Sequence, residues 1–189
     1  MKAPIALICA FAAAITPLGA TAEAADPQTQ ARAAIGAFSN ALKAELMAAM
    51  QAGGPLDAIE VCSVRAPAIA EAVSLDSGMQ LSRVSLRNRN PGNAPVEWQT
   101  SVLRNFERRL AAGEAAESLS WQELAEQGGR QEFRLMKAIP TAPLCLQCHG
   151  EAIAPPVAAK IAELYPGDQA TGYREGDIRG AFVVTRLLD

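Results

Sequence analysis

Apolar residues recur at helical spacing along the first third of the chain. From residue 26 to residue 52 they fall three or four positions apart, which places them on one face of a helix. This face comprises Ile35, Phe38, Leu42, Leu46 and Met50. The sequence Gly53-Gly54-Pro55 predicts the end of that helix.

A second helical stripe follows directly and contains a proline. Its apolar positions are Ile59, Cys62, Ala66, Ile69 and Val73. Because Pro67 cannot donate a hydrogen bond to the carbonyl of Ser63, we expect this helix to bend just after Cys62. A third helix is predicted to begin near Pro95, with Trp98, Val102, Phe106 and Leu110 recurring every four residues. Pro155-Pro156 opens a shorter one through Leu164.

Strand patterns occupy the stretches between and after these helices. Residues 79–86 predict a strand, with a bulge where the apolar alternation slips between Leu81 and Val84. Residues 118–124 and 130–139 predict two strands joined through Gly128-Gly129. Apart from Thr185 and Arg186, residues 178–188 are largely apolar on both alternating sets, which is typical of a central strand. Helices first and antiparallel strands later predict a single α+β domain.

Composition and charge narrow the class of protein. Half of the 189 residues are apolar and a fifth are charged, as in globular proteins. The net charge is −3, and no run of lysine and arginine occurs. A nucleic-acid partner is therefore not expected.

The N-terminus resembles an export signal. Lys2 precedes an apolar stretch over residues 5–18, and Ala22-Glu23-Ala24 has the small-x-small pattern of a cleavage site. The stretch is too short to span a bilayer and contains Pro17. We expect residues 1–24 to be removed together with Cys9, which leaves a periplasmic domain over residues 25–189 without a membrane span.

The motif Cys145-Leu146-Gln147-Cys148-His149 carries the clearest chemistry. Two cysteines three apart can each add to one vinyl group of a haem, and the adjacent histidine then reaches the iron as its proximal ligand. Pro143 and Gly150 bracket the motif and predict that it lies on a loop. One covalently bound haem c is the cofactor that this spacing predicts.

A Cys-x-x-Cys-His motif has three other uses in proteins. A thioredoxin-type redox site requires a βαβ context that the sequence lacks. A disulfide between Cys145 and Cys148 would close too small a ring to constrain much. Zinc is the serious rival, because Cys62 completes a Cys₃His set with the motif. Structural zinc sites usually pair two such knuckles, however, and only one occurs in this sequence.

The second axial ligand of the iron is open from the residues alone. His149 is the one histidine of the chain, so a second histidine is excluded within one protomer. Met79 and Met136 are candidates, whereas Met47 and Met50 fit packing on a helix face better. Cys62 is the thiol left over after two thioether bonds, and it is equally a small buried residue on a helix stripe.

Four segments in order resemble a family of PAS-like c-type haem domains long catalogued as a domain of unknown function. They are residues 58–70, 84–98, 145–150 and 165–181, and they include Arg87-Asn88-Arg89-Asn90-Pro91-Gly92 and Gly172-Tyr173-Arg174-Glu175-Gly176-Asp177. The resemblance implies a PAS-like fold, a central antiparallel sheet flanked by helices. It also implies axial ligation by histidine and cysteine, which maps onto His149 and Cys62. The sequence departs from the family at Val96-Glu97, where an acidic residue would directly follow Pro95.

Basic side chains commonly face haem propionates. Arg87, Arg89 and Arg179 are candidates for this role, with Tyr173 as a hydrogen-bond donor. Each is equally consistent with an ordinary solvated surface.

Two classes of function follow from these expectations. One is a redox protein that passes single electrons between periplasmic partners. The other is a haem-based redox or gas sensor, which would signal to a separate protein partner because no output region is recognisable here. Enzymatic turnover is not expected, since no acid, base or nucleophile beyond the haem motif is evident.

Overall fold

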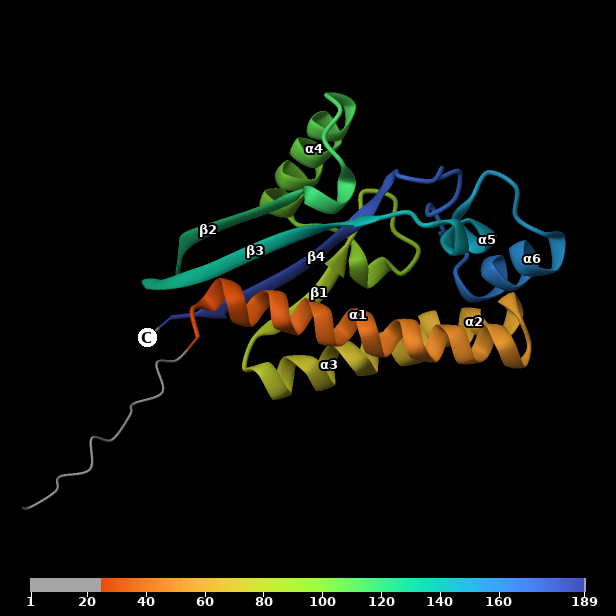
Figure 1. The fold of residues 1–189 in the computed structure, drawn as a ribbon, viewed down its shortest axis with the longest axis horizontal. Coiled ribbons are helices and arrows are strands. Elements are labelled where there is room, and N and C mark those ends of the chain that lie inside the picture. Colours follow the sequence, from red (N-terminus) through yellow and green to blue (C-terminus); the bar gives the residue numbers. More distant parts are fainter. Residues whose placement is uncertain (1–24, 189) are drawn as a thin grey trace, which may run out of the picture.

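The N-terminal half of the described chain is helical. The structure is a computed structural model that describes residues 25–188, so the predicted signal peptide over residues 1–24 lies outside it. Helix α1 spans Pro27–Ala52, and the carboxylate of Asp26 caps it by accepting hydrogen bonds from the backbone N–H groups of Gln28 and Thr29. Helices α2, Pro55–Glu60, and α3, Ala66–Ser77, then run back along α1 (Figure 1).

A π-helical turn, Val61–Arg65, joins α2 to α3 at the position where the sequence predicts a bend. The backbone N–H of Ala66 donates to the carbonyl of Val61, five residues earlier. One residue is thus inserted into the helix immediately before Pro67, whose missing N–H would interrupt a regular ladder. The helix is irregular at the predicted position, and the irregularity is a widened π-helical turn.

Four antiparallel strands form one sheet in the order β1-β4-β3-β2. They span Gln80–Val84 (β1), Ser120–Gln127 (β2), Arg130–Pro140 (β3) and Ile178–Leu187 (β4). As predicted, β4 is central and β2 and β3 form a hairpin. Gly128 and Gly129 at its turn have φ of 60° and 80°, a left-handed conformation that glycine adopts without strain.

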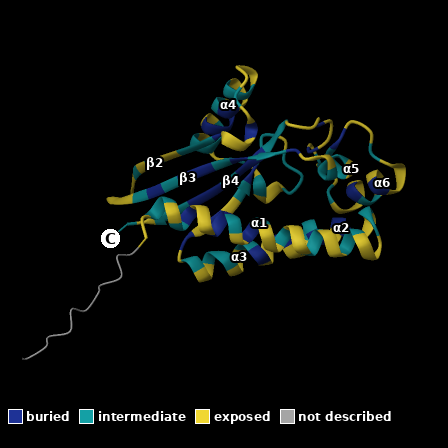
Figure 2. Cartoon of the chain, in the orientation of Figure 1, coloured by how far each residue is buried: buried dark blue, intermediate teal, exposed yellow. Residues whose placement is uncertain are grey.

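Helices cover both faces of this sheet (Figure 2). Helices α1 and α3 pack on one face around Phe38 and Val184, and α4, Glu97–Ala111, packs on the other around Phe106 and Val183. Leu81 belongs to the first core and Val84 to the second. The slip in alternation therefore reflects two buried faces. The predicted bulge at this point is wrong, because β1 pairs with β4 in unbroken register.

The haem-type motif lies on helical turns and not on an open loop as expected. A 3₁₀ turn, Pro143–Cys145, leads into the single turn α5, Leu146–His149. Helix α6, Pro155–Leu164, then packs Val157 and Ile161 against Ile59 of α2. This contact brings the C-terminal motif beside the N-terminal helices (Figure 1). Within residues 25–188 no helix is long and apolar enough to cross a membrane.

Candidate cofactor site

A cavity between α1, the π-helical turn and α5 brings the predicted ligands together. Cys62, Cys145, Cys148 and His149 all line it, although Cys62 lies far from the other three in sequence. Its space amounts to about 690 Å³, the open mouth included. The other apolar walls come from Leu42, Leu46, Met50, Ala58, Ile59 and Leu144. The cavity therefore combines sulfur and imidazole ligands with a largely apolar lining.

The imidazole of His149 is held in one tautomer. Its Nδ1 lies 2.7 Å from the carbonyl oxygen of Ala170, which can only accept, so Nδ1 carries the proton. Burial, followed by the positive charges of Arg179 and Arg89, lowers the pKa of His149 to about 3. The ring is therefore neutral, with Nε2 left as its basic nitrogen. This is the state in which histidine binds a metal.

The three described cysteines are free thiols, each half-buried. Burial raises the pKa of the Cys148 thiol, and the charge of Arg89 opposes that shift. Behind the motif, the backbone N–H of Gly172 donates to the carbonyl of Gly150, and that of Tyr173 donates to the carbonyl of His149. A Cβ on Gly150 would lie 2.6 Å from the carbonyl oxygen of Leu146, so the turn after the histidine requires glycine.

Arg89 links the haem-type motif to residues 168–170 through hydrogen bonds. Its guanidinium donates to both carboxylate oxygens of Asp168, at 3.0 and 3.1 Å. It also donates to the carbonyls of Cys148 (2.6 Å) and Ala170 (3.2 Å). The side chains of Arg89 and Asp168 are only 11% and 10% exposed. Arg89 lines the cavity, but these four acceptors already engage its donors, and its predicted contact with a haem propionate stays a prediction.

Arg87 and Tyr173 lie outside the residues that line the cavity. The guanidinium of Arg87 stacks 3.8 Å above the ring of Tyr173 and donates to the carbonyl of Thr171. Tyr173 is 3% exposed, and its ring meets that of His149 edge-on at 6.3 Å. The structure thus places these two behind the histidine, where they support its position.

Two arginines face the cavity from the sheet. Arg179 was among the candidates, whereas Arg83 of β1 was not. Burial, and then the charge of Arg179, lowers the pKa of the Arg83 guanidinium. The one signal for Arg83 in the sequence was a charged residue between Leu81 and Val84, in a strand covered on both faces.

The methionines are arranged differently from expectation. Met79 and Met136 are fully buried in the two cores and do not line the cavity. Met50, assigned to packing from the sequence, does line it. Among the sulfur atoms, the cavity therefore offers those of Cys62 and Met50 beside the motif.

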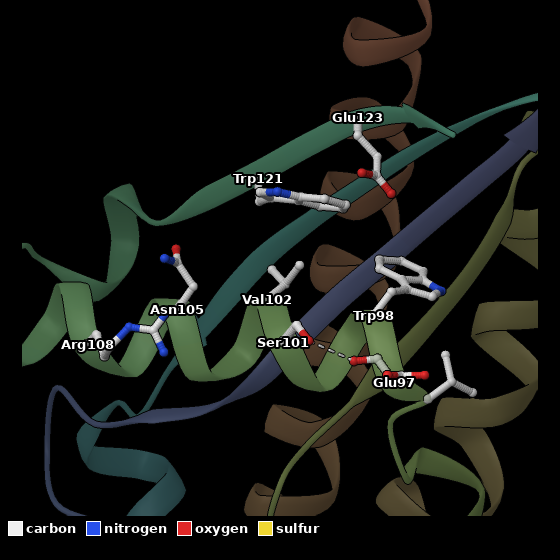
Figure 3. A pocket seen from close by; sticks show the side chains of 9 residues that line it. Glu97, Trp98, Ser101, Val102, Asn105, Arg108, Trp121 and Glu123 are labelled. Carbon is white, nitrogen blue, oxygen red and sulfur yellow. Dashed lines mark hydrogen bonds between the residues drawn. The ribbon is translucent and has the colours of Figure 1, made fainter. Parts of the chain in front are cut away.

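The described part of the chain offers no rival metal centre. Within residues 25–188, no three His, Cys, Asp or Glu side chains are grouped so as to hold a metal ion. The Cys₃His zinc set considered from the sequence is therefore not formed. A second, more open groove lies between α4 and β2, where Trp98 and Trp121 stack at 5.7 Å (Figure 3). It is lined by neither cysteine nor histidine, so the side chains that the sequence predicts to bind haem lie in the first cavity.

Comparison with known proteins supports the sequence resemblance. Residues 17–186 match the sequence profile of the Tll0287-like family. A crystal structure of the cyanobacterial heme-protein Tll0287 superposes with a TM-score of 0.63 and 25% sequence identity, covering 87% of this chain and 98% of that one. No curated protein matches the sequence. With most of its length matched by one profile and its fold shared with that structure, the chain belongs to the Tll0287-like family.

Proposed function

We propose that this protein is a periplasmic monohaem c-type cytochrome. Cys145 and Cys148 would hold the haem through thioethers formed by adding their S–H groups across its two vinyl groups, and Nε2 of His149 would bind the iron. The hydrogen bond from Nδ1 to Ala170 favours this role because it fixes the tautomer and raises the basicity of the ligand. The similarity to a cyanobacterial heme-protein supports the same cofactor.

The observation that carries the proposal is the position of Cys62. The fold brings this thiol to the wall of the cavity that the Cys-x-x-Cys-His motif also lines. Three of the four proposed haem-binding side chains lie within five consecutive residues, and the fourth, Cys62, reaches the cavity only through tertiary structure. We propose Cys62 as the distal ligand. Thiolate ligation donates electron density to iron and favours the ferric state, so a low reduction potential is expected.

Bound haem would supply one-electron chemistry. The apolar lining from α1 and α2 would limit water at a bound haem, and the half-buried Arg83 and Arg179 would place positive charge beside it. Electron transfer with a separate redox protein is the use that this arrangement supports best.

Sensing is the second candidate function, favoured by the π-helical turn that holds Cys62. Such turns are often found at functional sites. A ligand carried by an irregular turn can leave the iron on reduction, open a site for a small gas and change the surface offered to a signalling partner.

Production of the chain together with a haem-attachment system tests both parts. Haem that stays with the protein through acid-acetone extraction in wild type, and is extracted from Cys145→Ser/Cys148→Ser, establishes the thioethers. Electron paramagnetic resonance of the ferric form then tests Cys62→Ser, with Met79→Leu as a control that changes a sulfur residue away from the cavity. A colourless wild-type protein would exclude the cytochrome. A low-spin thiolate signal retained in Cys62→Ser would exclude the distal assignment.

A further inference from the structure

Arg83 and Arg179 reach the same cavity from neighbouring strands, and one of them does so through a break in the sheet. Strand β3 pairs Ile139 with Gly180 and then Pro140 with Ile178, so Arg179 is an extra residue on β4. Ile178 and Ala181 both pack against α4. Between them, Arg179 is turned to the other face, where it lines the cavity with Arg83.

The backbone at this bulge is specialised. Gly180 has φ of 158°, and a Cβ there would lie 2.3 Å from the carbonyl oxygen of Val84. Other residues would be both strained and obstructed. The bulge thus requires glycine at position 180, and its effect is to turn the side chain of Arg179 towards the cavity.

Among residues 25–188, neither guanidinium group has an anionic partner. Among residues 25–188, other arginines with internal ion pairs include Arg65, Arg89, Arg109, Arg134 and Arg174. Arg83 and Arg179 form no ion pair there, and the buried Nε of Arg179 has no hydrogen-bond partner. The guanidinium of Arg83 lies over the ring of Phe38, 5.1 Å from its centroid. Two unpaired cations beside an apolar wall are costly unless a ligand brings the negative charge.

We infer that Arg83 and Arg179 form a carboxylate-binding pair that anchors the haem propionates. The inference rests on the proposed function. A guanidinium binds a carboxylate through two parallel hydrogen bonds, and haem carries two such groups on the edge of the ring away from its vinyls. The motif would hold the vinyl edge while the sheet holds the propionate edge. Arg89, Arg87 and Tyr173, which have other partners, would act as supports.

The competing partner of Arg83 is Cys62, which would carry negative charge as an iron-bound thiolate. If Arg83 served that thiolate alone, its loss would alter the thiolate signal and leave the propionates unchanged. If Arg83 binds a propionate, replacing Arg83 changes the vibrations of that propionate in the holoprotein, and it does so even in a protein that carries Cys62→Ser.

The test uses haem-loaded protein carrying Arg83→Met, Arg179→Met or both, with the lysine variants at each position. Arg174→Met is the matched control, because Arg174 is exposed and pairs with Glu151. We expect the resonance Raman bands of propionate bending to shift in each methionine variant, and the midpoint potential to fall because a positive charge near the iron is lost. Lysine should restore the potential more fully than the bands, since it keeps the charge without the planar fork.

Each outcome bears on one claim. Propionate bands and potentials equal to those of the Arg174→Met control would overturn the inference while leaving the cytochrome intact. If Arg83→Met shifts the propionate bands only when Cys62 is present, Arg83 serves the thiolate, and its assignment as a propionate anchor is overturned. A wild-type protein without covalent haem would overturn the proposed function and this inference together. If a methionine variant fails to accumulate, its lysine counterpart decides: Raman bands equal to wild type would overturn the inference at that position.

Discussion

The pair formed by Arg89 and Asp168 should be the most sensitive polar contact of the site. Replacing Arg89 by methionine removes two charge-assisted hydrogen bonds to Asp168 and two more to the carbonyls of Cys148 and Ala170. The carboxylate of Asp168 is 10% exposed. Without Arg89 it still accepts a hydrogen bond from the backbone N–H of Ala170, but its positively charged partner is lost. Breaking a buried ion pair by removing one partner costs about 3–5 kcal/mol. Slight exposure lets water replace part of the loss, so we expect about 3–4 kcal/mol.

Urea unfolding of the holoprotein, followed by circular dichroism, measures this change. Arg89→Lys keeps the charge but not the fork, and should lose about half as much. Arg174→Met provides the control, because Arg174 and Glu151 are 76% and 57% exposed. Exposed pairs contribute about 0–1 kcal/mol, so this variant should unfold close to wild type.

A double-mutant cycle decides whether the two side chains act together. Asp168→Leu combined with Arg89→Met should be less destabilised than the sum of the single variants, since no uncompensated charge remains buried. The reasoning is refuted if Arg89→Met loses less than about 1 kcal/mol, or if the two changes are additive within about 0.5 kcal/mol.

Three further results are expected. Pro67→Ala supplies the missing N–H and should favour a regular helix in which Cys62 is rotated. The thiolate signal in electron paramagnetic resonance of the ferric protein should then weaken without loss of stability. An unchanged signal would contradict this. The hydrogen bond from Arg65 holds the pKa of Glu45 below its usual value. The contact therefore stabilises the fold fully at a pH above the ordinary carboxyl pKa. This stabilisation is lost as the pH falls through the lowered pKa of Glu45 in the folded protein. Its carboxyl titration, followed by nuclear magnetic resonance, should move upward in Arg65→Met, and no movement would count against the pair. Gly180→Ala should lower the free energy of unfolding by about 1–3 kcal/mol or more, as strain and overlap combine, whereas wild-type stability would show that the bulge relaxes.

Much of the fold follows from short-range pattern. The stripe on α1, the hairpin at Gly128-Gly129 and the doubly apolar β4 could each be assigned because periodicity and turn chemistry act over a few residues. The misplaced bulge shows the limit of this reasoning. Leu81 and Val84 break the alternation because separate helices cover the two faces, and local sequence does not record how many faces are covered.

The site divides along the same line. Cys145, Cys148 and His149 were found because their chemistry requires a fixed spacing in sequence. The partner of Arg89 could not be found in this way, since Asp168 lies far along the chain and reaches it only in the folded protein. Arg83 was missed because the pattern alone does not show which face of β1 meets a cavity.

Two irregularities of one residue each explain how Cys62 and Arg179, both named from the sequence, come to line the cavity. The π-helical turn adds a residue to the helix that carries Cys62, and the bulge adds Arg179 to β4. Each addition rotates one side chain relative to its regular neighbours, and in both cases that side chain lines the cavity. Regular helices and strands present their side chains at fixed intervals set by core packing. Under the proposed function, a thiol and a guanidinium would face a shared cofactor from positions between those intervals, which the π-helical turn and the bulge provide.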